Sequence, residues 1–258
     1  MVRFFAAPSD ISDGAIQLCA DDAVHIRSLR LRPTELFVVC DGEGSDYICR
    51  LGESGGAVAE IIETRPSEGE PSIECSVYIA HAKGDRLDYA VQKSVELGAH
   101  EIILYPSARC VAIPGDAGKK TARFRRIALE TSKQCGRGRV PDVIAQNSLA
   151  EAIERAASAG LALFLYECED KLSLKRALEQ YDAQSAVADP CPTDKGMKTN
   201  NGKSISIMTG PEGGFEPYEA QLAQAAGMLT VTLGPRILRC ETAPAAALAA
   251  LMFHTGNL

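Results

Sequence analysis

Hydrophobic and polar positions follow two different spacings along the 258-residue chain, and the change falls near residue 73. Before it, short apolar runs are separated by Gly and Asp turns, as in "ELFVVCDGEG", "DYICRLGESGG" and "AVAEIIETR". Closely spaced strands with no helix between them predict a small β-barrel or sandwich. The polar, Pro- and Gly-rich segment "RPSEGEPS" (65–72) predicts a linker. We therefore expect two domains, 1–72 and 73–258.

After the linker, continuous apolar runs alternate with helical patterns. The expected strands are "ECSVYIA" (74–80), "EIILYP", "LALFLYE", "SISIMTG" and "LTVTLG". The expected helices are "DRLDYAVQKSVELG" with Asp85 as N-cap, "TARFRRIALETSKQCG", "SLAEAIERAASAG" with the capping box Ser148-x-x-Glu151, "SLKRALEQY", "PYEAQLAQAAG" opened by Pro217, and "APAAALAALMF". This alternation predicts an α/β domain whose parallel sheet is covered on both faces. The polar segment 183–203 predicts a surface loop.

Two glycine-rich or arginine-rich loops follow the last two expected strands. Ligands of open parallel sheets bind beyond the carboxyl ends of the strands, which is where both loops lie. In "TGPEGGFEP", Gly210, Gly213 and Gly214 leave the main chain open to a ligand. The loop matches no phosphate-binding pattern, and Glu212 disfavours an anion. It suits an adenosine-type ligand that carries positive charge, or it is only a tight turn.

The second loop, "LGPRILRCETA", adds two arginines three positions apart. Arg236 and Arg239 can reach one cleft and bind a phosphate or an oxyanion. Cys240 beside them is either a thiolate nucleophile or, as for most buried cysteines that open a helix, a packing residue.

The formal net charge of −7 is unevenly distributed along the chain. Residues 1–73 hold six Lys or Arg and thirteen Asp or Glu, a difference of −7, so residues 74–258 sum to zero. Within the neutral part, residues 119–139 carry eight basic side chains against the single acid Glu130. Such a stretch binds phosphate groups through a local basic face, or it is a solvated helix face without a partner.

Other features restrict the cellular setting. No apolar run approaches the roughly 20 residues of a membrane helix, and the start "MVRFFAAPSD" lacks the apolar core of a secretory signal. The nine cysteines form no CxxC and the four histidines no HExxH, so we expect no metal. Scattered cysteines suit a reducing cytoplasm, and we expect a cytoplasmic protein without membrane contact.

Five ordered segments resemble those of one enzyme family. "IMTGPEGGFEPYE" and "VTLGPRILRCETAPAAAL" resemble the signature segments of the bacterial 16S ribosomal RNA uridine-N3 methyltransferases, the RsmE family. "DRLDYAVQKSVELGAHEIILYPSARCV", "ALETSKQCGRGRVPDV" and the N-terminal "RFF" with "HIRSLRLRPTELFVVCDGEG" resemble its other segments. The resemblance covers nearly the whole chain. It implies a PUA-like β-barrel followed by a SPOUT-type α/β domain with a trefoil knot, a homodimer, and S-adenosylmethionine as methyl donor for 16S ribosomal RNA in the small subunit.

The resemblance also assigns roles to residues of this sequence. Main-chain groups would bind the donor at Leu165, Tyr166, Glu167, Thr209, Gly210, Pro211, Glu212, Gly213, Gly214, Leu233, Gly234, Ile237, Leu238 and Arg239. RNA would contact Arg3, Arg27, Arg30, Lys93, Arg123, Arg125, Arg126 and Arg137. Glu96, Gln134 and Glu241 match further polar positions of the family.

Transfer to N3 of uridine requires loss of the N3 proton, which places negative charge on the ring carbonyls. We expect Arg236 or Arg239 to stabilise that charge and Glu241 or Glu212 to accept the proton. Two alternatives stay open. One is a SPOUT enzyme that modifies another RNA atom, such as a ribose 2′-hydroxyl. The other is an RNA-binding protein that has kept the cofactor pocket without catalysis.

Overall fold

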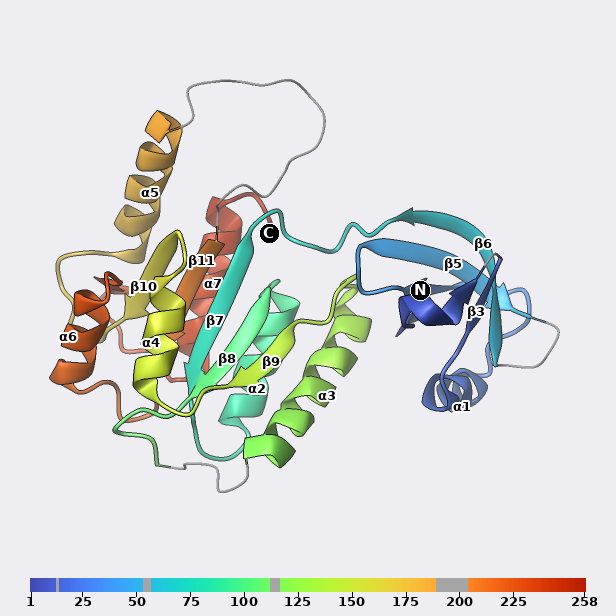
Figure 1. Cartoon of the computed structure of the whole chain (residues 1–258), viewed down its shortest axis with the longest axis horizontal. Coiled ribbons are helices and arrows are strands. Elements are labelled where there is room, and N and C mark those ends of the chain that lie inside the picture. The colour runs from blue at the N-terminus through green and yellow to red at the C-terminus, as the bar shows by residue number, and fades with distance from the viewer. Residues whose placement is uncertain (13, 53–56, 112–116, 189–203) are drawn as a thin grey trace. The chain divides into compact units, whose positions relative to one another are not determined.

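The computed structural model describes residues 1–12, 14–52, 57–111, 117–188 and 204–258 (Figure 1). The chain divides into two compact units. The first comprises Met1–Glu70 and Leu129–Val140, and the second comprises Pro71–Ala128 and Pro141–Leu258. The division crosses helix α3 (Ala117–Cys135), whose two ends therefore belong to different units.

The first unit is built on one six-stranded mixed sheet. Its strand order is β1-β4-β5-β6-β3-β2, and the strands are β1 (Arg3–Phe5), β2 (Ile11–Ser12), β3 (Ala15–Gln17), β4 (Phe37–Cys40), β5 (Ser45–Leu51) and β6 (Val58–Pro66). Phe4 and Phe37 are fully buried and meet edge to face at 5.6 Å. Ile16 completes this apolar centre, because alternate residues of each strand point to the same side of the sheet.

A helix interrupts these strands, contrary to the prediction of strands alone. Helix α1 (Ala20–Leu29) lies between β3 and β4, after the short 3-10 helix η1 (Pro8–Asp10). The thiol of Cys19 caps α1 by accepting a hydrogen bond from the Asp22 N–H at 3.4 Å. Ile26 packs into the apolar centre of the unit. The helix was missed because its cap is not one of the usual oxygen-bearing residues and its apolar positions are few.

The segment 129–140 is held within the first unit by two partly buried ion pairs. Lys133 Nζ lies 2.8 Å from Asp22 Oδ1, and Arg137 Nη2 lies 2.6 Å from Glu70 Oε2. The segment expected to be a linker, 65–72, begins inside β6. The two units are therefore not separated by a single cut at residue 72. Strand β6 extends into the expected linker, and the later segment 129–140 packs with the N-terminal residues.

The second unit contains an all-parallel sheet, as predicted. Its order is β12-β10-β11-β7-β8-β9, and the strands are β7 (Glu74–Ala80), β8 (Glu101–Tyr105), β9 (Asp142–Ala145), β10 (Leu161–Leu165), β11 (Ser204–Thr209) and β12 (Leu229–Val231). Every expected strand of this unit is present. The additional edge strand β9 is short and only Val143 within it is buried, so its sequence carries a weak apolar signal.

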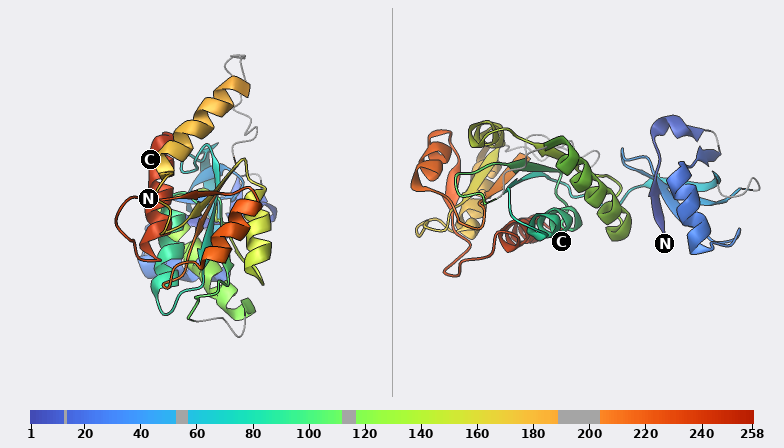
Figure 2. Two further views of the ribbon diagram at one scale, coloured as in Figure 1. Left: turned by 90° about the vertical axis from the view of Figure 1, so that its left-hand side faces the viewer. Right: turned by 90° about the horizontal axis from the view of Figure 1, so that it is seen from below.

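Helices cover both faces of this sheet (Figure 2). Helices α2 and α7 pack together on one face, and α4 packs on the other beside α6. Their bounds are α2 (Arg86–Glu96), α4 (Leu149–Ala157), α5 (Leu174–Ala188), α6 (Pro217–Ala225) and α7 (Thr242–His254). Helix α5 includes the first six residues of the loop expected at 183–203, and 189–203 lie outside the described residues. The α/β class is confirmed, while the trefoil knot stays a prediction.

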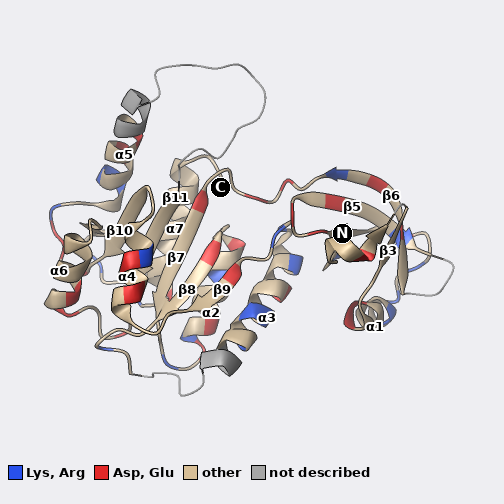
Figure 3. Cartoon of the chain, in the orientation of Figure 1, with Lys and Arg blue, Asp and Glu red and all other residues tan. Residues whose placement is uncertain are grey.

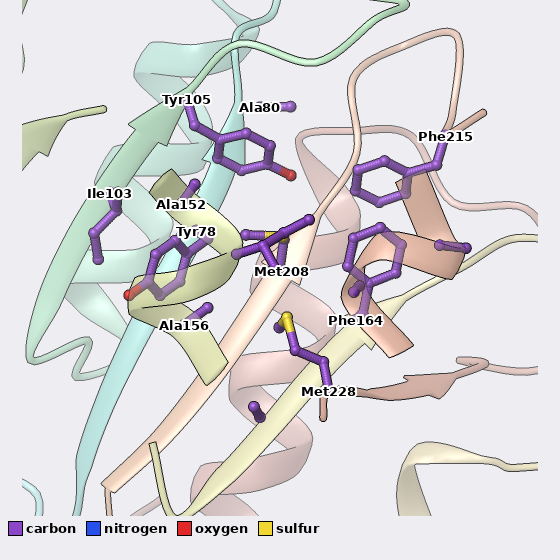
Figure 4. Packing of buried hydrophobic residues seen from close by; sticks show 14 residues of the cluster. Tyr78, Ala80, Ile103, Tyr105, Ala152, Ala156, Phe164, Met208, Phe215 and Met228 are labelled. Carbon is purple, nitrogen blue, oxygen red and sulfur yellow. The ribbon is translucent and has the colours of Figure 1, made fainter. Parts of the chain in front are cut away.

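Large aromatic side chains fill the space between the sheet and α4 and α6 (Figure 4). The rings of Phe164 and Phe215 lie 4.1 Å apart, and both are buried. The hydroxyl of the fully buried Tyr105 donates to the main-chain carbonyl of Thr209 at 2.7 Å. A buried phenol requires such a partner. The end of β11 and the loop after it therefore rest on a packed core.

Candidate functional site

The three strands β12, β10 and β11 are neighbours, and they end at the same level of the sheet. The register pairs Phe164 with Met208 and Leu165 with Val231. The loops that leave their carboxyl ends therefore emerge side by side, as ligand sites of parallel sheets require. Together they enclose a cavity of about 880 Å³, which is within the usual range for small-molecule sites.

Every residue that the family resemblance assigned to the methyl donor lines this cavity. These are Leu165, Tyr166, Glu167, Thr209, Gly210, Pro211, Glu212, Gly213, Gly214, Leu233, Gly234, Ile237, Leu238 and Arg239. Arg236 and Glu241, assigned to catalysis, line it as well. Below, residues 210–216 are called the glycine loop and residues 232–241 the arginine loop.

At Gly210 and Gly214 the glycine loop has no room for a side chain. Gly214 has a φ of +68°, and a Cβ added there would lie 1.8 Å from Glu167 Oε1. That Glu167 oxygen accepts a hydrogen bond from the Phe215 N–H at 2.9 Å. A Cβ on Gly210 would meet the Phe215 ring at 3.0 Å. The glycines thus let the chain fold tightly over Phe215 while its main chain faces the cavity.

Glu212 holds the glycine loop to the start of α2. Its Oε1 accepts hydrogen bonds from the Lys83 N–H at 2.8 Å and from Arg86 Nη1 at 2.9 Å. Burial acts to raise the pKa of Glu212, but these two donors and the loop's own N–H outweigh it and leave the pKa below its ordinary value. Its Oε2 is buried and has no hydrogen-bond partner in the described part of the chain. The cavity thus contains an ionised carboxylate with one oxygen unused.

The arginine loop is more open to solvent. Arg236 and Arg239 are exposed, and Ile237 between them is 85% exposed. The side-chain contacts at its start are local, because Thr232 Oγ1 donates to the Gly234 carbonyl at 3.3 Å and accepts from the Gly234 N–H at 3.1 Å. The two guanidinium groups are therefore available at the cavity, as the sequence predicted.

Cys240 and Glu241 close this loop at the start of α7. Burial, aided by a hydrogen bond to Glu241 and by nearby carboxylates, raises the pKa of Cys240 to about 12. The thiol is therefore neutral at physiological pH, and of the two interpretations the packing one fits the structure. Burial also acts to raise the pKa of Glu241, but hydrogen bonds and the charges of Arg86 and Arg239 outweigh it and lower that pKa. Glu241 is consequently a carboxylate.

Sequence reasoning missed three charged residues of the cavity: Arg86, Glu169 and Asp170. Arg86 begins α2, and residues 81–85 form the loop that joins it to β7, so the strand-end rule applied to β7 would have pointed to this region. With these additions the lining holds five carboxylates and three guanidinium groups, a formal excess of two negative charges.

In the described ranges no helix is long and apolar enough to cross a membrane.

Two arginines expected to face RNA instead lie mostly covered in ion pairs within the first unit. Arg3 Nη1 lies 2.8 Å from Asp46 Oδ1, and its side chain is 11% exposed. Arg137 is 3% exposed and pairs with Glu70. Removing a guanidinium from a buried pair would leave an unpaired charge. This placement argues against an RNA contact for Arg3 and Arg137 and indicates that they hold the first unit together.

The other expected RNA-facing cations lie at the surface. Arg27 and Arg30 are exposed at the end of α1 in the first unit. In the second unit, Arg125 and Arg126 are exposed on α3, where Figure 3 shows basic residues along the helix. The two remaining cations are paired with acids, Lys93 with Glu96 and Arg123 with Asp88. The side chains of Lys119 and Lys120 lie outside the described residues.

Comparison with known proteins decides the family. Residues 69–252 match a family model described as an RNA methyltransferase domain. The ribosomal RNA small subunit methyltransferase E of Bacillus subtilis is 30% identical over 89% of this chain and 86% of its own. The chain belongs to the ribosomal RNA small subunit methyltransferase E family. The resemblance predicted from its sequence segments is thereby confirmed.

Relatives in this family match the chain over nearly its whole length. The methyltransferase E of a Synechocystis strain is 30% identical over 96% of this chain and 76% of its own. A crystal structure of the methyltransferase E of Neisseria gonorrhoeae, bound to S-adenosyl methionine, is 32% identical. It superposes with a TM-score of 0.77 and covers 98% of this chain and 97% of its own. The arrangement of a β-rich unit before a parallel sheet is thus the family fold.

Proposed function

We propose that this protein transfers a methyl group from S-adenosylmethionine to N3 of a uridine in the 16S ribosomal RNA of the small subunit. The observation that carries the proposal is the cavity at the three strand ends, whose lining combines open main chain with an excess of carboxylates. The relative from Neisseria gonorrhoeae, which has the same fold, is described as bound to this donor.

The residues of the cavity fit a donor that carries positive charge. The Oε2 of Glu212 is buried and has no hydrogen-bond partner in the described part of the chain. A bound ligand with a hydrogen-bond donor or a positive charge would satisfy it. Gly210, Gly213 and Gly214 present main-chain groups that could bind an adenosine edge. The surplus of two carboxylates over guanidinium groups favours a cation over an anion. Each of these features supports S-adenosylmethionine over a nucleotide phosphate.

When bound, S-adenosylmethionine supplies an activated methyl group on a sulfur that departs as a neutral thioether. In this proposal the main chain of Leu165–Glu167, of the glycine loop and of Leu233–Arg239 holds the donor. The protein then contributes mainly alignment, because it fixes the donor relative to the attacking nitrogen. The target uridine must be unpaired or flipped, since N3 lies on the base-pairing edge.

The arginine loop provides for the charge on the base. When N3 loses its proton, negative charge develops on the adjacent carbonyl oxygens. The exposed guanidinium groups of Arg236 and Arg239 lie at the cavity and can donate hydrogen bonds to those oxygens. The charge of Arg239 helps to lower the pKa of Glu241, which is therefore ionised. Glu241 can accept the proton directly or through water. Glu212 is less suited to accept the proton, because its Oε1 already accepts hydrogen bonds from the Lys83 N–H and from Arg86.

RNA contacts are proposed on each unit separately. The first unit, proposed as the RNA-binding domain, offers Arg27 and Arg30, and the second offers Arg125 and Arg126. All four are exposed, and phosphate binding by such groups is weakened by salt. Substituting Arg123, Arg125 and Arg126 together by alanine should weaken RNA binding and flatten its salt dependence. Unchanged binding at every salt concentration would show that α3 is not part of the RNA-binding surface.

The protein is also proposed to form a homodimer. Phe253 on α7 is 75% exposed and Tyr89 on α2 is 47% exposed, and these two helices pack together. Large apolar side chains at the surface of adjoining helices indicate an interface. Light scattering should give the mass of two chains, and Phe253→Glu should reduce it to that of one.

The reaction is tested with small subunits from a strain that lacks the gene. They are incubated with the purified protein and S-adenosylmethionine, and the ribosomal RNA is digested to nucleosides for mass spectrometry. We expect 3-methyluridine at about one residue per subunit. A 2′-O-methylated nucleoside would assign the enzyme to another RNA atom, and absence of any new nucleoside would contradict methyl transfer.

A further inference from the structure

The segment that leaves β8 contacts the glycine loop and the first turn of α6, although the sequence places them more than a hundred residues apart. Ser107, Ala108 and Arg109 lie just after β8, separated from it by one residue, and each donates a hydrogen bond to the region 213–219. None of the three is among the cavity-lining residues in the described part of the chain. The contact therefore lies behind the cavity wall.

Glu219 is the buried centre of this contact. Its side chain is fully buried, and its Oε1 accepts from the Ser107 hydroxyl at 2.8 Å and the Ala108 N–H at 2.9 Å. Its Oε2 accepts from the Glu216 N–H at 2.8 Å. A buried carboxylate is tolerated only when its oxygens are satisfied in this way. The exit of β8 and the start of α6 are thereby fixed to one side chain.

Arg109 extends the contact to the glycine loop itself. Its Nε donates to Glu216 Oε1 at 2.8 Å, and its Nη1 donates to the Gly213 carbonyl at 2.9 Å. A planar guanidinium can bind both acceptors at once, whereas a lysine ammonium is a point charge on a flexible chain. A Cβ on Gly213 would lie 2.9 Å from the Arg109 Cβ. The loop therefore passes directly against this arginine.

We propose that Arg109 is a positioning residue for the methyl donor. It fixes the Gly213 carbonyl and the N-cap residue of α6, and so sets the conformation in which residues 210–214 line the cavity. The donor's identity rests on the proposed function, but the control of loop conformation by Arg109 does not. The geometry predicts that Arg109 affects donor binding although it is not among the described residues that line the cavity.

The test compares Arg109→Ala and Arg109→Lys with Arg155→Ala. Arg155 is a matched control because its side chain is 41% exposed against 42% for Arg109, and it pairs with Glu101 at 2.7 Å. Glu101 begins β8, so this pair lies at the opposite end of the same strand from the 107–109 segment. If loss of a surface ion pair were the only effect, Arg109→Ala and Arg155→Ala would behave alike, and each would change stability little.

We expect Arg109→Ala to weaken S-adenosylmethionine binding by about tenfold or more in calorimetry, since two charge-assisted hydrogen bonds are lost. The KM for the donor should rise while kcat at saturating donor is retained. Arg109→Lys should not restore the affinity, and Arg155→Ala should bind as the unaltered protein does. Donor affinity that is equal in all four proteins would overturn the proposal.

Hydrogen exchange separates this inference from the proposed function. If the unaltered protein does not bind the donor, the proposed function fails, while exchange in the glycine loop still tests Arg109. We expect residues 210–216 to exchange about tenfold faster in Arg109→Ala than in Arg155→Ala. Equal exchange in the two variants would show that Arg109 does not set the loop conformation.

Discussion

The glycine loop and the arginine loop form opposite parts of one cavity but are held in different ways. Side chains from three other segments bind the glycine loop, namely Glu167, Arg86 and Arg109. Its Phe215 is buried against Phe164. In the arginine loop, the side-chain hydrogen bonds seen in the described part of the chain join near neighbours in sequence, such as Thr232 with Gly234.

This difference indicates a division of tasks within the site. A loop held from several strand ends is preformed, so little entropy is lost when a ligand binds its main chain. A loop with exposed arginines and local contacts can adjust to a second, larger substrate. We infer that the glycine loop contributes more than the arginine loop to affinity for the donor, and that the arginine side chains determine the rate at which the base reacts.

The largest expected effect follows from truncating the arginine loop. Arg239→Ala should lower kcat by about 10²–10³-fold, because it removes a donor to the developing charge on the base. Donor affinity measured by calorimetry should change by less than about threefold. Arg176→Ala on α5 is the control, since that arginine is exposed and outside the cavity. A loss of donor affinity equal to the loss of kcat would contradict the division of tasks.

The next effect concerns the contact between Glu212 and the start of α2. Glu212→Gln should lower the free energy of unfolding at pH 7 by about 1–3 kcal/mol, because charged hydrogen bonds to Lys83 and Arg86 are weakened. The pKa of Glu212 is lower in the folded protein than its ordinary value of 4.5. Its contribution is therefore complete above pH 4.5 and is lost as the pH falls through the lower folded value.

Urea unfolding at pH 7 and at pH 3 measures this contribution. The difference between Glu212→Gln and the unaltered protein should shrink at pH 3, because that pH lies below 4.5 and the Glu212 carboxyl of the unfolded chain then binds a proton. Glu179→Gln is the control, because its contact with Lys175 is 3.7 Å long and exposed. A difference that stays constant between the two pH values would show that the charge of Glu212 is not responsible.

Sequence reasoning succeeded where a signal is local. The strands β10, β11 and β12 are continuous apolar runs, and the glycines and arginines that follow them are read from a few adjacent positions. The rule that ligands bind at carboxyl strand ends then predicts the cavity from the sequence. Pro217 likewise occupies the first turn of α6, as its fixed φ favours.

It failed where a residue's role depends on a distant partner. Arg109 contacts Gly213 and Glu216 across 104 and 107 positions of sequence, and no periodicity encodes such a pairing. For the same reason Arg3 was expected at an RNA surface, although Asp46 binds it 43 positions away. A basic residue has one sequence signature whether it faces solvent or a buried carboxylate, so only the fold distinguishes the two.

A pair of glycine substitutions compares the two loops directly. Gly214 and Gly234 have positive φ values of 68° and 111°, so alanine is strained at both. At Gly214 the new Cβ also displaces Glu167 from the Phe215 N–H, whereas at Gly234 no atom of the described residues lies within 4 Å of the new Cβ. We expect Gly214→Ala to weaken donor binding by about tenfold and Gly234→Ala by less than about threefold in calorimetry. Equal losses would mean that the loops contribute alike.

The smallest effect is expected at Cys240, which lies in the arginine loop but faces inward. Because its pKa is raised to about 12, its thiol stays protonated and acts only as a hydrogen-bond donor to Glu241 at 3.2 Å. Cys240→Ser keeps a donor at this position and should change kcat by less than about threefold, with an unaltered dependence of rate on pH. Cys240→Ala, which removes the donor, tests whether Glu241 depends on that bond. A loss of about a thousandfold in both variants would instead identify the sulfur as a nucleophile and reverse the assignment of chemistry to the arginines.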